Sequence, residues 1–227
     1  MYDLVFEVLR RLQSSKVLSS MILIGSWCMH FYKYYFTSDE YVGAIRTLDI
    51  DFLVSTPLNV KIEVDIPNML HDLGFIVRFS GDKGYIKLVH PDLIVEFLVA
   101  ERGPGTDAPV KFPQLGINAV ALRYLDFLAE HVIIINIEGL KIRIPHPAAY
   151  ALHKFIVFGR RKKKDKKERD LEGALRVFRA LIADKKKKDI KRIFLTMHKK
   201  WQKTVVSNLR GAGEDEIARF LEDFMLH

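Results

Sequence analysis

The chain has 227 residues, 49% of them apolar, and a net charge of +8, so it can fold into one large or two small domains and is not intrinsically disordered. Its single cysteine, Cys28, excludes an internal disulfide framework and indicates a reducing, cytoplasmic location, with the thiol buried as a small apolar group. We expect neither a secretory signal peptide nor a membrane-spanning segment, because no apolar run reaches the required length.

The first predicted elements are an amphipathic helix over residues 3–13, a strand over Met21–Ile24 and a helical run over Trp27–Tyr35. Gly25 and Ser26 join the strand to the helical run. Free backbone N–H groups at a helix start attract phosphate, and glycine permits its close approach, so both residues are candidates for phosphate binding. The alternative is an ordinary tight turn in which Ser26 caps the helix.

A second strand, Leu48–Val54, contains two aspartates. Side chains on a strand repeat every two residues, so Asp49 and Asp51 share one face, and we expect Leu48, Ile50 and Phe52 to point into a core. Two neighbouring carboxylates repel each other and are costly to desolvate. A divalent cation would relieve both costs, and hard oxygen ligands of this kind suit Mg²⁺.

The next predicted elements are a helix over Val60–Leu73, with a kink or a start near Pro67, and the strands Phe75–Phe79, Tyr85–Val89 and Leu93–Val99. The near-continuous apolar run of the last strand implies burial on both faces. Glu96 interrupts this run and therefore needs a metal, a cation such as a Lys or Arg side chain, or solvent at a cleft.

Residues 101–113 are rich in Gly and Pro and predict a loop, and Ala119–Ala129 has short helical character. A hairpin, Val132–Ile137 and Leu140–Ile144, ends the first predicted domain, an α/β core over residues 1–144. Residues 145–227 predict a basic helical bundle, so the fold class is α+β. Its helices are expected at 146–158, 170–182, 189–206 and 214–225.

Gly25-Ser26 after a strand, followed by the alternating acids of Leu48-Asp49-Ile50-Asp51, resembles the nucleotidyltransferase superfamily that includes DNA polymerase beta. The run from Arg46 to Asp51 is similar to the branch holding minimal nucleotidyltransferases and type IV abortive-infection toxins. The resemblance implies a mixed sheet with helices and a Mg²⁺- or Mn²⁺-dependent transfer of a nucleotide from a nucleoside triphosphate such as ATP. It also implies that Glu96 supplies a third catalytic carboxylate and metal ligand beside Asp49 and Asp51.

Further residues enter through this resemblance. Arg46 and Thr47 are expected at the nucleotide phosphates, although Arg46 could equally balance the acids. Lys154 would contact the triphosphate, and Asp170, which is expected to open a helix after a basic loop, would orient a basic residue. The alternatives are a snorkelling lysine and a plain charge at a helix N-terminus.

The basic charge is concentrated at the C-terminal end. Residues from Lys154 onward contain 22 Lys and Arg against 11 Asp and Glu, a net charge of +11, whereas residues 1–153 contain 14 against 17, a net charge of −3. Such a surface favours an anionic partner. The candidate acceptor-binding residues are Arg160, Arg161, Lys163 and Lys164.

We expect the acceptor to be RNA, for example a tRNA end, and the toxin branch adds an antitoxin-like protein as a partner. Three alternatives stay open: a small-molecule acceptor of the aminoglycoside type, a protein side chain, and a non-catalytic module that binds nucleic acid or a partner protein. Salt-dependent RNA binding without nucleotide turnover would indicate the last of these.

Overall fold

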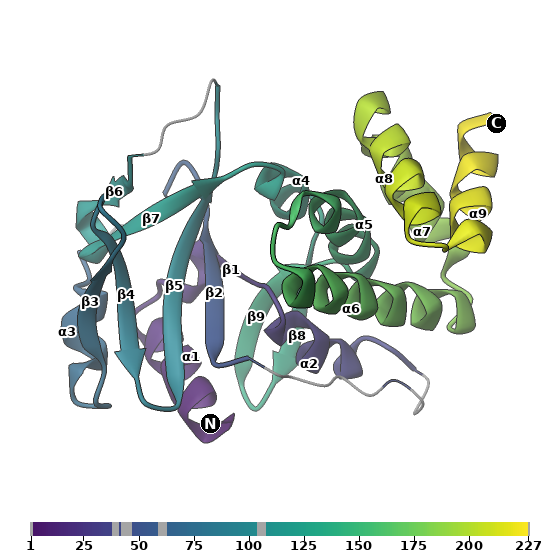
Figure 1. The fold of residues 1–227 in the computed structure, drawn as a ribbon. Helices are drawn as coiled ribbons and strands as arrows, with labels where there is room; N and C mark the ends of the chain where they lie inside the picture. The colour runs from purple at the N-terminus through teal and green to yellow at the C-terminus, as the bar shows by residue number, and fades with distance from the viewer. Residues whose placement is uncertain (1, 38–40, 42–46, 59–62, 104–107, 227) are drawn as a thin grey trace. The chain divides into compact units, whose positions relative to one another are not determined.

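The computed structural model describes residues 2–37, 41, 47–58, 63–103 and 108–226, and the chain divides into two compact units. Unit 1 comprises Met1–Phe31 and Ala44–Pro145, and unit 2 comprises Tyr32–Gly43 and His146–His227. Unit 1 contains a mixed β-sheet with short helices, and the described secondary structure of unit 2 is helical (Figure 1). The predicted α+β class is confirmed. None of the helices that the structure describes is long and apolar enough to cross a lipid bilayer.

Unit 1 alternates short helices with strands, as the sequence pattern predicts for most of its length. Its α-helices are α1 (Tyr2–Ser14), α2 (Trp27–Phe31), α3 (Ile66–His71) and α4 (Leu125–Glu130). Its strands are β1 (Met21–Ile24), β2 (Asp49–Val54), β3 (Ile76–Ser80), β4 (Tyr85–His90), β5 (Leu93–Ala100), β6 (Val110–Phe112), β7 (Ile117–Leu122), β8 (Val132–Ile137) and β9 (Leu140–Pro145).

The strands of the main sheet follow the order β1-β2-β5-β4-β3, with β7 beside the end of β5 and β6 beside β7. The β2–β5 and β5–β7 pairs are parallel, and the other pairs are antiparallel. A parallel pair needs a long crossover, and here α3, β3 and β4 supply the chain between β2 and β5. The predicted hairpin is confirmed as the separate two-stranded sheet β8–β9.

Side-chain alternation gives the central strands β2 and β5 two different faces. One face is buried and includes a stacked pair, Phe52 and Phe97, whose ring centroids lie 6.3 Å apart. The other face is only half-buried at its acidic end, which has Asp49, Asp51, Ile94 and Glu96. The prediction that β5 is buried on both faces is therefore wrong, because carboxylates that stay partly hydrated avoid the desolvation cost of a closed core.

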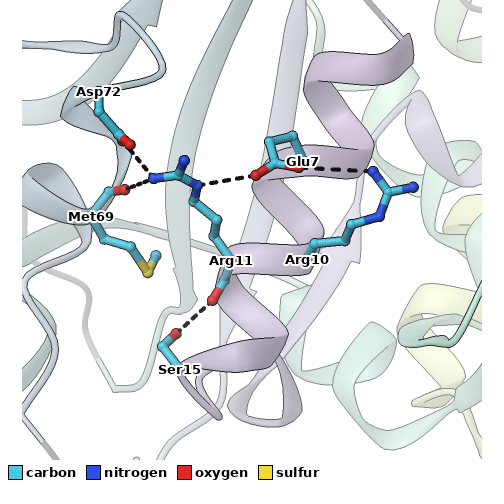
Figure 2. A network of polar contacts seen from close by, with 6 residues as sticks. All are labelled: Glu7, Arg10, Arg11, Ser15, Met69 and Asp72. Atoms are coloured by element: carbon cyan, nitrogen blue, oxygen red, sulfur yellow. Dashed lines mark hydrogen bonds and ion pairs between the residues drawn. The ribbon is translucent and has the colours of Figure 1, made fainter.

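A polar network attaches α1 to α3 (Figure 2). The Arg11 guanidinium donates through Nη1 to the Met69 carbonyl at 2.9 Å and to Asp72 at 2.5 Å, and through Nε to Glu7 at 3.2 Å. Carbonyls in the last turn of a helix lack intrahelical partners, so Arg11 closes the C-terminal end of α3. The hydrogen bond from Arg11 lowers the pKa of the Asp72 carboxyl.

Two sequence predictions in unit 1 need correction, and a third is confirmed. Leu48 was expected in the core but is 47% exposed, because β2 begins only at Asp49. The expected helix over Ala119–Ala129 is the strand β7 followed by the short helix α4, since the apolar run Ile117–Leu122 pairs with β5 and β6. The predicted helix start near Pro67 is confirmed, because α3 begins at Ile66, where Asp65 caps it by accepting a hydrogen bond from the Asn68 N–H at 3.0 Å; residues 60–62 lie outside the described residues.

The described residues of unit 2 form five α-helices around a shared apolar core. They are α5 (Pro147–Val157), α6 (Lys164–Ala183), α7 (Lys187–Thr196), α8 (Lys199–Gly211) and α9 (Asp215–Leu226). The expected loop over Arg160–Arg169 is wrong beyond Lys163, because lysine and glutamate are good helix formers and α6 starts six residues before Asp170. The helix expected over 189–206 is divided at Met197 and His198, which have extended backbones.

Candidate active site

Strand register brings two of the predicted carboxylates onto neighbouring strands. Strands β2 and β5 lie side by side (Figure 1). They pair in parallel, with Asp51 of β2 opposite Glu96 of β5 and Asp49 opposite Ile94 two residues earlier. Paired residues on adjacent strands point to the same face, so Asp49, Asp51 and Glu96 share the half-buried face of the sheet. The sequence predicted this face for the two aspartates. The place of Glu96 beside them depends on the register between β2 and β5.

Thr47 supports the first aspartate. Its hydroxyl donates to Asp49 Oδ2 at 3.3 Å and accepts a hydrogen bond from the Asp49 backbone N–H at 3.2 Å. These two contacts hold the start of β2 and restrict the carboxylate that projects from it. Arg46, the other residue expected at the phosphates, lies outside the described residues.

Gly25 makes room for the second aspartate. Ile24, the last residue of β1, pairs with Asp51, and a Cβ atom added to Gly25 would lie 2.3 Å from Asp51 Oδ2. Gly25 also has a φ of +74°, which a residue with a side chain rarely adopts. A glycine at this position is thus required both by the turn after β1 and by the carboxylate that lies against it.

Glu96 has a cationic partner that the sequence pattern did not single out. The ammonium of Lys87, on β4, donates to Glu96 Oε1, and the two residues are directly paired in the antiparallel β4–β5 register. The side chains of Lys87 and Glu96 are 34% and 22% exposed. The only sequence signal for this contact was the presence of Lys87 in the predicted strand Tyr85–Val89. Nothing in the spacing of Lys87 indicates that it faces Glu96.

The donor chemistry of this face suits a hard divalent cation. Among the residues that the structure describes, no three His, Cys, Asp or Glu side chains form a group able to hold a metal ion by themselves. Mg²⁺ is commonly bound by one or two carboxylates together with substrate phosphates and water, so the pair Asp49 and Asp51 fits it. The opening that Gly25 leaves beside Asp51 is consistent with a ligand at this carboxylate.

Unit 2 contains the other predicted group of polar site residues. Lys154 on α5 donates to Asp170 on α6 at 2.5 Å, and Arg161 donates through Nε to the second oxygen of Asp170 at 2.8 Å. Burial would raise the pKa of Asp170, but its attraction to Lys154 and the hydrogen bonds from both cations lower it overall. Asp170 therefore orients two basic side chains within unit 2, and it lies inside α6 rather than at the start of a helix.

A buried histidine lies next to this ion pair in the sequence. Burial lowers the pKa of His153 to about 3, and the adjacent charge of Lys154 contributes in the same direction. His153 is therefore neutral at physiological pH. Arg160, Lys163 and Lys164, expected to contact the acceptor, are exposed at and before the start of α6.

Comparisons with known proteins identify a family and a similar fold. A family model described as a nucleotidyltransferase matches residues 3–198. No curated protein matches the chain. An antigenic nucleotidyltransferase-like protein from Paracoccidioides brasiliensis has a similar solved structure, with a TM-score of 0.50 at 12% identity over 96% of this chain and 92% of that one.

Two solved structures of ANT(2'')-Ia are also similar. In its complex with adenylyl-2''-tobramycin the TM-score is 0.44 at 13% identity, covering 81% of this chain and 96% of that one. In solution this protein, an antibiotic-resistance factor, gives a TM-score of 0.43 at 13% identity over 86% and 97% of the two chains.

Proposed function

We propose, from the premise that this chain belongs to the nucleotidyltransferase family and is a transferase, that it transfers a nucleoside monophosphate from a nucleoside triphosphate to a hydroxyl group of RNA. The observation that supports the reaction is the shared face of Asp49, Asp51 and Glu96, with Gly25 making room beside Asp51. In this reaction the acceptor oxygen bonds to the α-phosphorus, the bond to pyrophosphate breaks, and the hydroxyl proton passes to water.

We assign the roles within unit 1 as follows. Asp49 and Asp51 hold a divalent cation, Mg²⁺ or Mn²⁺, with the triphosphate, and Thr47 keeps Asp49 in position. When bound, such a cation neutralises charge on the triphosphate and activates the attacking hydroxyl. Glu96, which is one strand away from Asp51, is assigned to the acceptor side. The N–H groups at Gly25 and Ser26 contact phosphate, which the close approach allowed by glycine favours.

The choice of RNA as acceptor rests on the basic surface of unit 2. Every residue from Gly159 to Arg169 is exposed, including the first turns of α6. Cations at a helix N-terminus are unfavourable next to the helix dipole, so this cluster is stabilised when an anion binds. A nucleic-acid backbone supplies several such anionic groups at once.

The test is transfer of label from each α-³²P nucleoside triphosphate, with Mg²⁺, to total RNA and to total protein. We expect labelled RNA, and we expect the Asp49→Asn/Asp51→Asn variant to produce none. Label in protein, or in a small-molecule acceptor such as an aminoglycoside, would overturn RNA as the acceptor. RNA binding without any transfer from the wild-type chain would favour the non-catalytic alternative.

A further inference from the structure

We propose that Lys87 is a positioning residue that regulates divalent-cation binding. Its ammonium forms an ion pair with Glu96, and this ion pair must break before Glu96 can turn toward a cation at Asp49 and Asp51. This inference rests on the proposed function, since it concerns the same carboxylates. It adds a residue from β4 to a site otherwise built from β1, β2 and β5.

The register places Glu96 between two opposite charges. On one side it is paired with Asp51 of β2, and on the other with Lys87 of β4. Neighbouring strands lie about 4.8 Å apart, so Lys87 and Asp51 are about two strand spacings apart with Glu96 in the middle. Glu96 is repelled by the carboxylate on one side and attracted by the ammonium on the other, and its contact with Lys87 is the result.

The contact is of a kind that can be released. A lysine ammonium is a point charge on a flexible stem and makes no bidentate fork with a carboxylate, unlike arginine. The side chain of Lys87 is one-third exposed, so its ammonium can move into water. A cation at Asp49 and Asp51 attracts Glu96 and repels Lys87, so cation binding and the Lys87–Glu96 pair oppose each other.

Arg78 provides a matched control within the same sheet. It pairs with Lys87 across the β3–β4 register, so it projects from the same face one strand farther from the carboxylates. Replacing Arg78 or Lys87 by methionine removes one positive charge and keeps a long side chain. Only the Lys87 substitution removes the ammonium that contacts Glu96.

The test measures Mn²⁺ binding to the full chain, without nucleotide, from the electron paramagnetic resonance signal of free Mn²⁺. We expect Lys87→Met to tighten Mn²⁺ binding on the order of fivefold, and Arg78→Met to change it by less than about twofold because of charge screening. In a Glu96→Gln background, Lys87→Met should change Mn²⁺ affinity by less than about twofold, because only the screened charge of Lys87 is then removed. Lys87→Gln is the second variant if Lys87→Met does not fold, as judged by circular dichroism.

The outcomes separate this inference from the proposed function. If Asp49→Asn/Asp51→Asn binds Mn²⁺ like the wild type, the proposed cation site itself is wrong. If that variant loses binding but Lys87→Met leaves affinity unchanged or weaker, the role of Lys87 alone is wrong. Equal tightening by Arg78→Met, or tightening of the same size in the Glu96→Gln background, would also overturn the role of Lys87, because either result reflects charge in general.

Discussion

Asp170 accepts hydrogen bonds from Lys154 at 2.5 Å and from Arg161 at 2.8 Å, so one carboxylate of α6 joins α5 to the segment that precedes α6. The side chains of Lys154 and Asp170 are only 13% and 14% exposed, whereas that of Arg161 is 44% exposed. The two ion pairs therefore differ in how much each contributes to stability, because a water-exposed pair is largely offset by solvation.

The first prediction compares these two pairs. Asp170→Asn leaves the ammonium of Lys154 buried without a countercharge, and we expect it to lower the free energy of unfolding by about 3 kcal/mol. Arg161→Gln removes the exposed partner and should cost less than about 1 kcal/mol. Urea unfolding followed by circular dichroism measures both. Equal losses in the two variants would show that the Lys154 pair has no special role in stability.

The second prediction concerns acid sensitivity. The folded pKa of His153, about 3, lies below its ordinary value of 6.5, so the unfolded chain binds the proton first. The contribution of His153 to the free energy of unfolding is fully present above pH 6.5. It falls as the pH approaches 3, with a slope of up to about 1.4 kcal/mol per pH unit. The pKa of Asp170 is lowered from 3.8, so its own stabilising contribution is lost at a lower pH than that of His153.

The measurement for His153 is urea unfolding at several pH values between 7 and 4.5. The His153→Gln variant is the control, because it removes the titrating group and keeps a polar side chain. We expect the difference in the free energy of unfolding between the wild type and His153→Gln to narrow as the pH falls. Parallel curves over this range would contradict a neutral, buried His153.

The third prediction tests the opening beside Asp51. Gly25→Ala places a methyl group 2.3 Å from Asp51 Oδ2 in addition to straining a φ of +74°. Gly81 has a φ of +69° with nothing within 4 Å of an added Cβ atom, so Gly81→Ala has the backbone strain alone, costing about 1 kcal/mol. We expect Gly25→Ala to lose more stability than this and to abolish nucleotide transfer. Nucleotide transfer by Gly25→Ala at the wild-type level would show that Gly25 is not part of the active site.

The fourth prediction concerns the basic surface of unit 2. If Lys163 and Lys164 each neutralise one phosphate, replacing both with glutamine reduces the slope of log affinity against log salt concentration for single-stranded RNA by about 1.4. The matched control is Lys83→Gln/Lys111→Gln, which removes two exposed lysines from unit 1. Titration of fluorescent RNA at several salt concentrations gives both slopes. The same slope change in both variants would indicate a general charge effect.

The alternation of residues along the chain determined much of unit 1. It predicted β2, β4, β5 and the β8–β9 hairpin, and it placed Asp49 and Asp51 on one face, because a strand's period of two needs no partner to define it. Helical spacing likewise predicted α1, α5 and α9. These are local properties, and local sequence is sufficient for them.

The break between α7 and α8 depends on local side-chain caps that helical periodicity does not reveal. No Gly or Pro marks Met197 and His198, yet the buried side chain of Gln202 donates to the Phe194 and Met197 carbonyls, both at 3.1 Å, and so closes α7. His198 then begins α8 by accepting the Lys200 N–H at 3.2 Å. Because either residue also fits a continuous helix, the sequence pattern did not distinguish one helix from two.

The neighbours of the carboxylates depend on strand register. Asp51 and Glu96 come together only when β2 and β5 pair in parallel, and Lys87 reaches Glu96 only through the register of β4. Gly25 was predicted to bind phosphate at the junction after the first strand, but its close approach to Asp51 depends on the pairing of β1 with β2. The sequence determined which face of β2 is acidic, and tertiary pairing decided which side chains meet there, because register is set by contacts between segments distant in the chain.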